Sequence, residues 1–106
     1  MTELFKLIDR AQRLGAEEKV PPIEALQLAQ DIAEHADASA DFDDIVELVD
    51  YPKNYYARWI GVRAISVMGA KAIRHVETLL RRRLDVEDFD LAKRELRNAL
   101  AKLDEA

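Results

Sequence analysis

Apolar residues recur along this chain at steps of three and four, with polar residues between them, which is the pattern of amphipathic α-helices. No segment shows the strict alternation of a strand joined to hairpin turn residues. Gly15, Pro52 and Gly69 stand where a helix is expected to stop. The pattern predicts six helices, at about 3–14, 22–37, 41–49, 54–68, 70–84 and 87–104.

The second half of the chain carries one pattern twice, about 35 residues apart. Residues 57–68 align with residues 92–103 at small, basic and branched apolar positions, and Asp50 before the first copy aligns with Asp85 before the second. A single helix pair cannot bury its apolar stripe alone. The repeat therefore predicts helix pairs that stack on one another and present an extended binding surface.

The order of residues in this unit resembles the HEAT-repeat family, in particular the short bacterial type also found in phycobilisome-lyase-like proteins. The resemblance covers 41–105, whereas 3–37 shares only the layout of a helix pair. It implies an all-α fold, a short right-handed α-solenoid of about three antiparallel helix pairs at 3–37, 41–69 and 70–105, within one domain over 1–106. The residues that carry it are Asp50, Ala57-Arg58, Ala64-Ile65, Gly69 and Ala72-Ile73, repeated as Asp85, Ala92-Lys93 and Ala99-Leu100.

The resemblance also implies a role for four charged residues. In HEAT-like stacks, the turn aspartate and the arginine of the second helix typically support one another across adjacent repeats. Asp50, Arg58, Asp85 and Lys93 occupy these positions. We therefore expect them to form structural charge pairs, and removal of one partner from a partly buried pair is costly.

The opposite face of the second helices is the predicted partner-binding surface. If Ala57, Gly61 and Ala64 face the core, helical geometry turns the next face of that helix away from it. That face holds Tyr55, Trp59, Val62, Arg63 and Ser66, and its counterpart one repeat later holds Asp90, Arg94, Arg97, Asn98 and Ala101. Tyrosine, tryptophan and arginine are enriched at binding hot spots. The candidate partner-binding residues are Tyr55, Trp59, Arg63, Arg94, Arg97 and Asn98. In the alternative interpretation, Trp59 packs under a neighbouring helix and the arginines are merely solvated.

The net charge of −5 hides a difference between the two halves of the chain. Residues 1–52 carry four basic and thirteen acidic side chains, and residues 53–106 carry twelve basic and eight acidic ones. Such a dipolar charge distribution bears on association with charged partners. The negative net charge of the chain argues against nucleic-acid binding. Binding of nucleic-acid phosphates by the basic helix faces is a minor alternative.

Residue types that support catalysis are scarce. The chain has no cysteine, and its two histidines, His35 and His75, lie in different helix pairs without the spacing of a metal site. Asp41, Asp43 and Asp44 stand at a predicted helix start, where they complement the helix dipole. We therefore expect no metal, no cofactor and no enzymatic activity.

No apolar run approaches the roughly 20 residues of a membrane span, and the start lacks a signal-peptide pattern, which predicts a cytoplasmic location.

Taken together, these features predict a non-catalytic protein–protein interaction module. Its partner is expected to be another protein with an acidic or mixed surface, and its role that of an adaptor, an inhibitor or an immunity-type partner. Self-association is a further option, because the first helix has a broad apolar surface that includes Phe5. In the preferred interpretation, however, Phe5 belongs to a deeper core and not to a dimer contact. The alternative follows from similarity to bilin lyase subunits, which implies a bound tetrapyrrole, although the chain lacks a cysteine and a plausible histidine pair.

Overall fold

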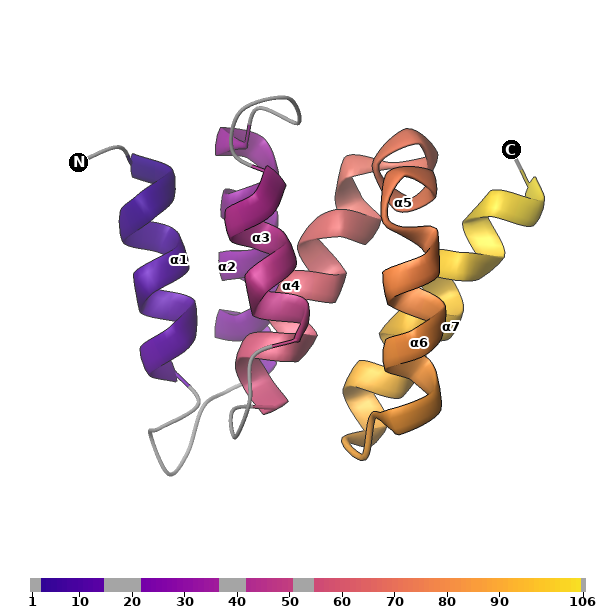
Figure 1. The fold of residues 1–106 in the computed structure, drawn as a ribbon. Helices are drawn as coiled ribbons and strands as arrows, with labels where there is room; N and C mark the ends of the chain where they lie inside the picture. Colours follow the sequence, from indigo (N-terminus) through magenta and orange to yellow (C-terminus); the bar gives the residue numbers. More distant parts are fainter. Residues whose placement is uncertain (1–2, 15–21, 37–41, 51–54, 106) are drawn as a thin grey trace.

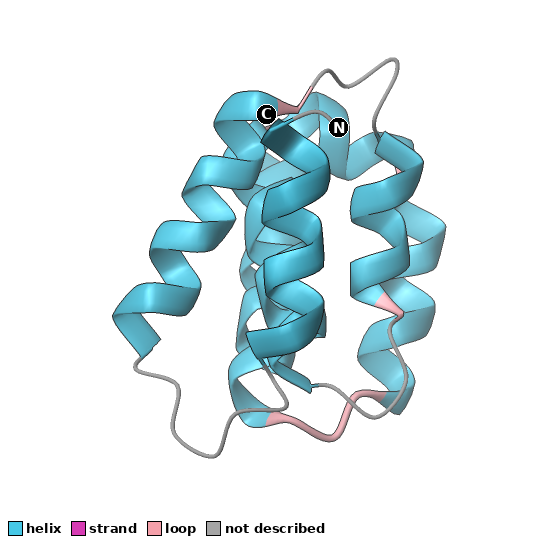
Figure 2. Cartoon of the chain, turned by 90° about the vertical axis from the view of Figure 1, so that its left-hand side faces the viewer, coloured by secondary structure: helices cyan, strands magenta, loops and turns pink. Residues whose placement is uncertain are grey.

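The structure is a computed structural model that describes residues 3–14, 22–36, 42–50 and 55–105. Helices make up nearly all of this described part, which contains no strand (Figure 2). None of these helices is long and apolar enough to pass through a membrane. The helices are α1 (Glu3–Leu14), α2 (Pro22–His35), α3 (Phe42–Val49), α4 (Tyr55–Met68), α5 (Ala70–His75), α6 (Glu77–Val86) and α7 (Asp90–Glu105).

The expected single helix over 70–84 is divided into α5 and α6, which corrects the prediction. The break lies at Val76, whose backbone has φ −118° and ψ 19°. The Val76 amide donates to the carbonyl of Ile73 at 3.1 Å, a three-residue step in place of the four-residue step of an α-helix. Val76 is neither glycine nor proline and its side chain is buried in the core, so tertiary packing and not local chemistry sets the break.

Helix α4 lies at the centre of the molecule and contacts α1, α2, α3, α5 and α7. In Figure 1 the chain advances from α1 on one side to α7 on the other, with α3 in front of α2 and α6 in front of α7. The radius of gyration is 12.5 Å, close to the roughly 13 Å of a compact domain of this length. The all-α prediction is confirmed, and the right-handed solenoid of three pairs stays a prediction.

Two glycines determine how α4 packs and where it ends. A Cβ atom on Gly61 of α4 would lie 2.7 Å from the Cβ of Leu48 and 3.0 Å from the backbone nitrogen of Val49, so glycine permits the close contact between α3 and α4. Gly69 has φ 105°, a conformation that favours glycine, and it separates α4 from α5. The predicted helix end at Gly69 is confirmed.

Candidate functional site

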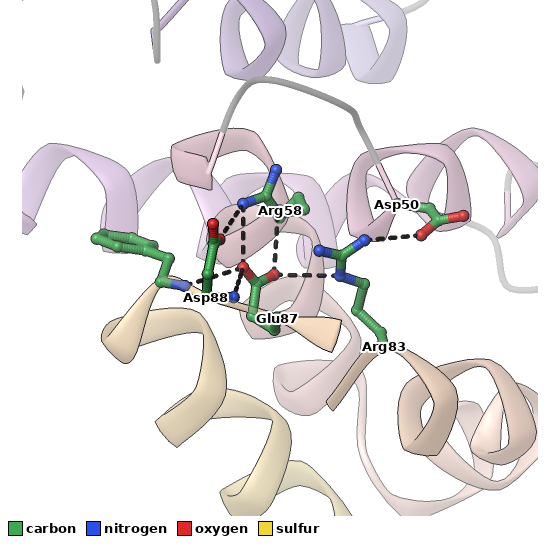
Figure 3. Close-up of polar contacts among 6 residues, drawn as sticks. Asp50, Arg58, Arg83, Glu87 and Asp88 are labelled. Atoms are coloured by element: carbon green, nitrogen blue, oxygen red, sulfur yellow. Dashed lines mark hydrogen bonds and ion pairs between the residues drawn. The ribbon is translucent and has the colours of Figure 1, made fainter. Parts of the chain in front are cut away.

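A buried charge network joins α4 to the segment that precedes α7 (Figure 3). The Arg58 side chain is 7% exposed and the Glu87 side chain is fully buried. The guanidinium of Arg58 donates from Nε to Oε1 of Glu87 at 2.9 Å and from Nη2 to Oε2 at 3.0 Å, which is a bidentate pair. Nη2 of Arg58 also donates to Oδ1 of the exposed Asp88 at 3.2 Å.

Glu87 also completes the start of α7. Its Oε2 accepts hydrogen bonds from the backbone amides of Asp88 and Phe89, each at 3.1 Å. Both amides lie at the start of α7, where backbone amides have no carbonyl partner within the helix. The Glu87 carboxylate supplies the missing acceptor. Burial by itself raises the pKa of Glu87, but the hydrogen bonds from Arg58 and from the Phe89 amide and the charges of Arg58 and Arg83 outweigh it. The resulting pKa of Glu87 lies below the ordinary glutamate value, so the buried carboxyl is ionised at neutral pH.

Arg83 of α6 extends the network toward α3. Its Nε lies 3.3 Å from Oε1 of Glu87, and its Nη1 donates to Oδ1 of Asp50 at 3.2 Å (Figure 3). The carboxylate of Asp50 is half exposed, whereas the side chain of Arg83 is 15% exposed. The charged groups therefore form a chain from α3 through α6 to the junction of α4 and α7.

The predicted charge pairs are partly corrected by this network. Arg58 is buried and forms charge pairs, but its partners are Glu87 and Asp88 in the segment before α7, and Asp50 pairs with Arg83. Asp85 is exposed, and within the described residues no ion pair joins it to Lys93. The sequence prediction missed Glu87 because it placed this residue inside the last helix. The acidic run before the apolar positions of α7 is a helix-start signal that could have found it.

The structure places Trp59 in the core, with 5% of its surface exposed. Its ring lies 6.0 Å from the ring of Tyr56 and 6.3 Å, edge to face, from that of Phe89. Phe89 and Tyr56 are themselves 5.5 Å apart, so the three rings form one aromatic cluster at the seam between α4 and α7. Val62 and Ser66 are buried as well. The expectation that this face of α4 is turned away from the core is wrong, because α7 and its preceding turn pack against it.

Two further contacts fasten α7 to α4. Nη1 of Arg63 donates to Oε1 of Glu95 at 3.2 Å, and Nζ of Lys102 donates to the backbone oxygen of Ser66 at 2.8 Å. The same carbonyl, at the end of α4, also accepts from the Gly69 amide at 3.2 Å. The positive charge of Lys102 at this helix end complements the helix dipole. The Glu95 side chain is 9% exposed and that of Arg63 is 41% exposed. Arg63 therefore forms an intramolecular ion pair, although part of its side chain is exposed at the surface.

The outer face of α7 agrees with the prediction. Arg94, Arg97 and Asn98 are exposed, while Leu96 and Ala99 on the other side of the helix are fully buried. None of the hydrogen bonds and ion pairs found among the described residues involves the side chain of Arg94 or Arg97. Of the six candidate binding residues, the structure thus brings three together at the surface. The side chain of Tyr55 lies outside the part of the chain whose side chains are described.

The described residues contain no group of three or more histidine, aspartate or glutamate side chains that could hold a metal ion. His35 contacts the backbone oxygen of Asp31 through Nδ1 at 2.8 Å, and both it and His75 are exposed. Comparison of the chain with protein-family models, with curated proteins and with solved structures finds no match, so the likeness to HEAT repeats stays a prediction from the sequence.

Proposed function

We propose that the protein is a non-catalytic protein-interaction module that binds an acidic or mixed protein surface with the exposed side of α7. This side, called the α7 face, consists of Asp90, Arg94, Arg97, Asn98 and Ala101. The observation that carries the proposal is the contrast between the two sides of one helix. The inner side is held to α4 by hydrogen bonds and ion pairs, whereas the arginines of the outer side have no such contact among the described residues.

The inner contacts are spread over the whole length of α7. Glu87 and Arg58 hold its start, Glu95 and Arg63 its middle, and Lys102 its end. A helix held in this way loses little conformational freedom when a partner binds, and such preorganisation favours affinity. The α7 face therefore offers two arginines on a rigid support, and arginine is one of the residue types most enriched at binding hot spots.

The proposal includes the finer architecture and setting that the sequence suggests. α2 packs against α4 and α4 packs against α7, as expected for the second helices of three stacked HEAT-like pairs. In this interpretation α7 is the second helix of the third pair of a short right-handed solenoid, and the second helices of such a stack line up an extended binding surface. An adaptor, an inhibitor or an immunity-type protein of the cytoplasm would use such a surface in the same way.

The experiment compares two variants that each reverse two exposed positive charges. The test variant is Arg94→Glu with Arg97→Glu on α7, and the matched control is Lys6→Glu with Arg10→Glu on α1. Wild type and both variants, shown by circular dichroism to be equally helical, are used as bait in a native lysate. The retained protein is identified by mass spectrometry, and its affinity for each purified bait is then measured by titration.

We expect the control to bind as wild type does and the α7 variant to bind at least about tenfold more weakly, because each hot-spot residue contributes more than about 1 kcal/mol. Equal binding by wild type and both variants would refute a role for the α7 face. A change in the visible spectrum of an added bilin, without any retained protein, would support the tetrapyrrole alternative over the interaction module.

A further inference from the structure

The exposed side of α3 is an acidic stripe made of Asp43, Asp44 and Glu47. The helix contains no basic residue, and its inner side is formed by Ile45 and Leu48, which are fully buried in the core. Among the described residues, no hydrogen bond or ion pair involves these three carboxylates. Like charges at this spacing on a helix repel one another. A positively charged surface laid on α3 would relieve that repulsion.

A stripe of opposite charge lies on the exposed side of α5 and α6. It consists of Lys71, Arg74, Arg82 and Val86, with the exposed carboxylate of Asp85 beside Arg82 on the same side of α6, and α5 itself contains no acidic residue. Arg81 is left out because its Nε already donates to Oε2 of Glu77 at 2.8 Å. Val86 is 62% exposed, and it is one of two large hydrophobic side chains exposed among the described residues. The basic stripe thus combines positive charge with an apolar anchor, which is the composition of a contact surface.

The two stripes lie on the same side of the molecule. α3 packs against α4 and α6 packs against α7, and in Figure 1 both α3 and α6 are drawn in front of the helices that they cover. The 3.2 Å contact between Arg83 of α6 and Asp50 after α3 shows that the two elements are neighbours. α5 also packs against α4 and α7. The exposed sides of α3, α5 and α6 all point away from α4 and α7 and therefore share one face.

We propose that a second copy of this chain covers this face, in a two-fold symmetric dimer in which the acidic stripe of each copy lies on the basic stripe of the other. A two-fold contact uses the same patch on both copies, so a patch that carries both signs side by side is self-complementary. The molecule measures 35 × 30 × 22 Å, so a broad face can supply the roughly 800 Å² per partner of a standard interface. Exposed ion pairs are individually weak, so the dimer is expected to be weak and sensitive to salt.

Sedimentation of the full chain over a range of concentrations tests the dimer. At low ionic strength the mass is expected to rise with concentration from 12.1 kDa to twice that value. The dissociation constant is expected to increase at least about tenfold at high salt, where exposed charges are screened. A wild-type chain that stays monomeric under all these conditions would overturn the proposal, and so would a dimer whose stability does not depend on salt.

Charge-reversal variants test which surfaces meet. The acidic-stripe variant carries Asp43→Lys, Asp44→Lys and Glu47→Lys, and the basic-stripe variant carries Lys71→Glu, Arg74→Glu and Arg82→Glu. Each is expected to be monomeric alone, because stripes of like charge then face each other. An equimolar mixture is expected to dimerise, because in the mixed dimer every stripe again meets its opposite. If the lysines in the first turn of α3 lower the helicity of the acidic-stripe variant, two single variants are used in place of the triple ones. These are Glu47→Lys on the acidic stripe and Arg82→Glu on the basic stripe.

Failure of the dimer proposal can be distinguished from failure of the proposed binding role of the α7 face. Arg94→Glu with Arg97→Glu and the α1 control are both expected to dimerise as wild type does, since neither alters a stripe. A mixture of the stripe variants that stays monomeric, although wild type dimerises, would refute this pairing of surfaces. Loss of the dimer in the α7 variant, with the stripe variants unaffected, would refute it as well and place the contact on α7.

Discussion

At the scale of single residues, the carboxylate of Glu87 connects three helices at one point. It binds Arg58 of α4 in bidentate fashion, lies against Arg83 of α6 and accepts the amides that precede α7. A carboxylate buried without such partners would carry a penalty of several kcal/mol. The network therefore makes the position of α7 depend on the ionisation of one side chain.

Glu87→Gln tests this dependence. The substitution keeps the shape of the side chain but leaves Arg58 without its buried counter-charge, so we expect a loss of about 3 kcal/mol in the free energy of unfolding at neutral pH. The folded-state pKa of Glu87 is lowered, so its stabilising contribution is present above the unfolded-state pKa and is lost as pH falls through the folded-state pKa. Urea unfolding at neutral and acidic pH measures both effects.

The variant is expected to lose less stability than wild type on acidification, because the titrating group is gone. Asp85→Asn is the matched control, since Asp85 is exposed two residues away and should change stability by less than about 0.5 kcal/mol. If Glu87→Gln were as stable as the Asp85 control at neutral pH, the network would contribute nothing to folding.

The aromatic residue Trp59 shows where sequence reasoning stops at this scale. Periodicity groups it correctly with Val62 and Ser66 on one side of α4, and all three are in fact buried. The period says which residues share a face, but it does not say whether a neighbouring helix covers that face. Here Phe89, thirty residues later in the chain, packs against Trp59 and removes it from the surface.

At the scale of elements, the contact between α3 and α4 depends on the absence of a side chain at Gly61. Any Cβ there would be placed within 3.1 Å of three atoms of Leu48 and Val49, two of which belong to the backbone. Backbone atoms cannot move aside as the end of a flexible side chain can. The two helices can therefore keep this separation only with glycine at this position.

Gly61→Ala sets two opposing effects against each other. Alanine favours the helix by about 1 kcal/mol relative to glycine, whereas overpacking a well-packed core costs about 1–3 kcal/mol. Because the clash involves backbone, we expect the steric effect to dominate and the melting temperature to fall. Differential scanning calorimetry of the variant beside wild type measures the sign. A rise in melting temperature would mean that α3 moves away from α4 at little cost.

At the scale of the whole molecule, one hydrophobic core runs from α1 to α7. Its buried members extend from Ile8 to Leu100, and α4 contributes to the contacts of five other helices. Elements that share a single core and a central helix are expected to unfold together, as small single domains usually do. The charged network between α4, α6 and α7 adds to this coupling.

We therefore expect a single cooperative unfolding transition. Circular dichroism reports on all the helices, whereas fluorescence of the one tryptophan reports on the seam between α4 and α7. The two transitions in urea should have the same midpoint and the same slope. A separate, earlier loss of helicity would show that some helices unfold independently of the seam between α4 and α7.

The sequence by itself determined the all-α class, most helix positions, the helix end at Gly69 and the exposed side of α7, including Arg94 and Arg97. Each of these follows from periodicity or from the conformational preference of one residue, which are local properties of the chain. Only the tertiary structure decided the burial of Trp59, the pairing of Arg58 with Glu87 and the break at Val76. These depend on which helices pack together, and packing joins residues about thirty positions apart that no local pattern relates.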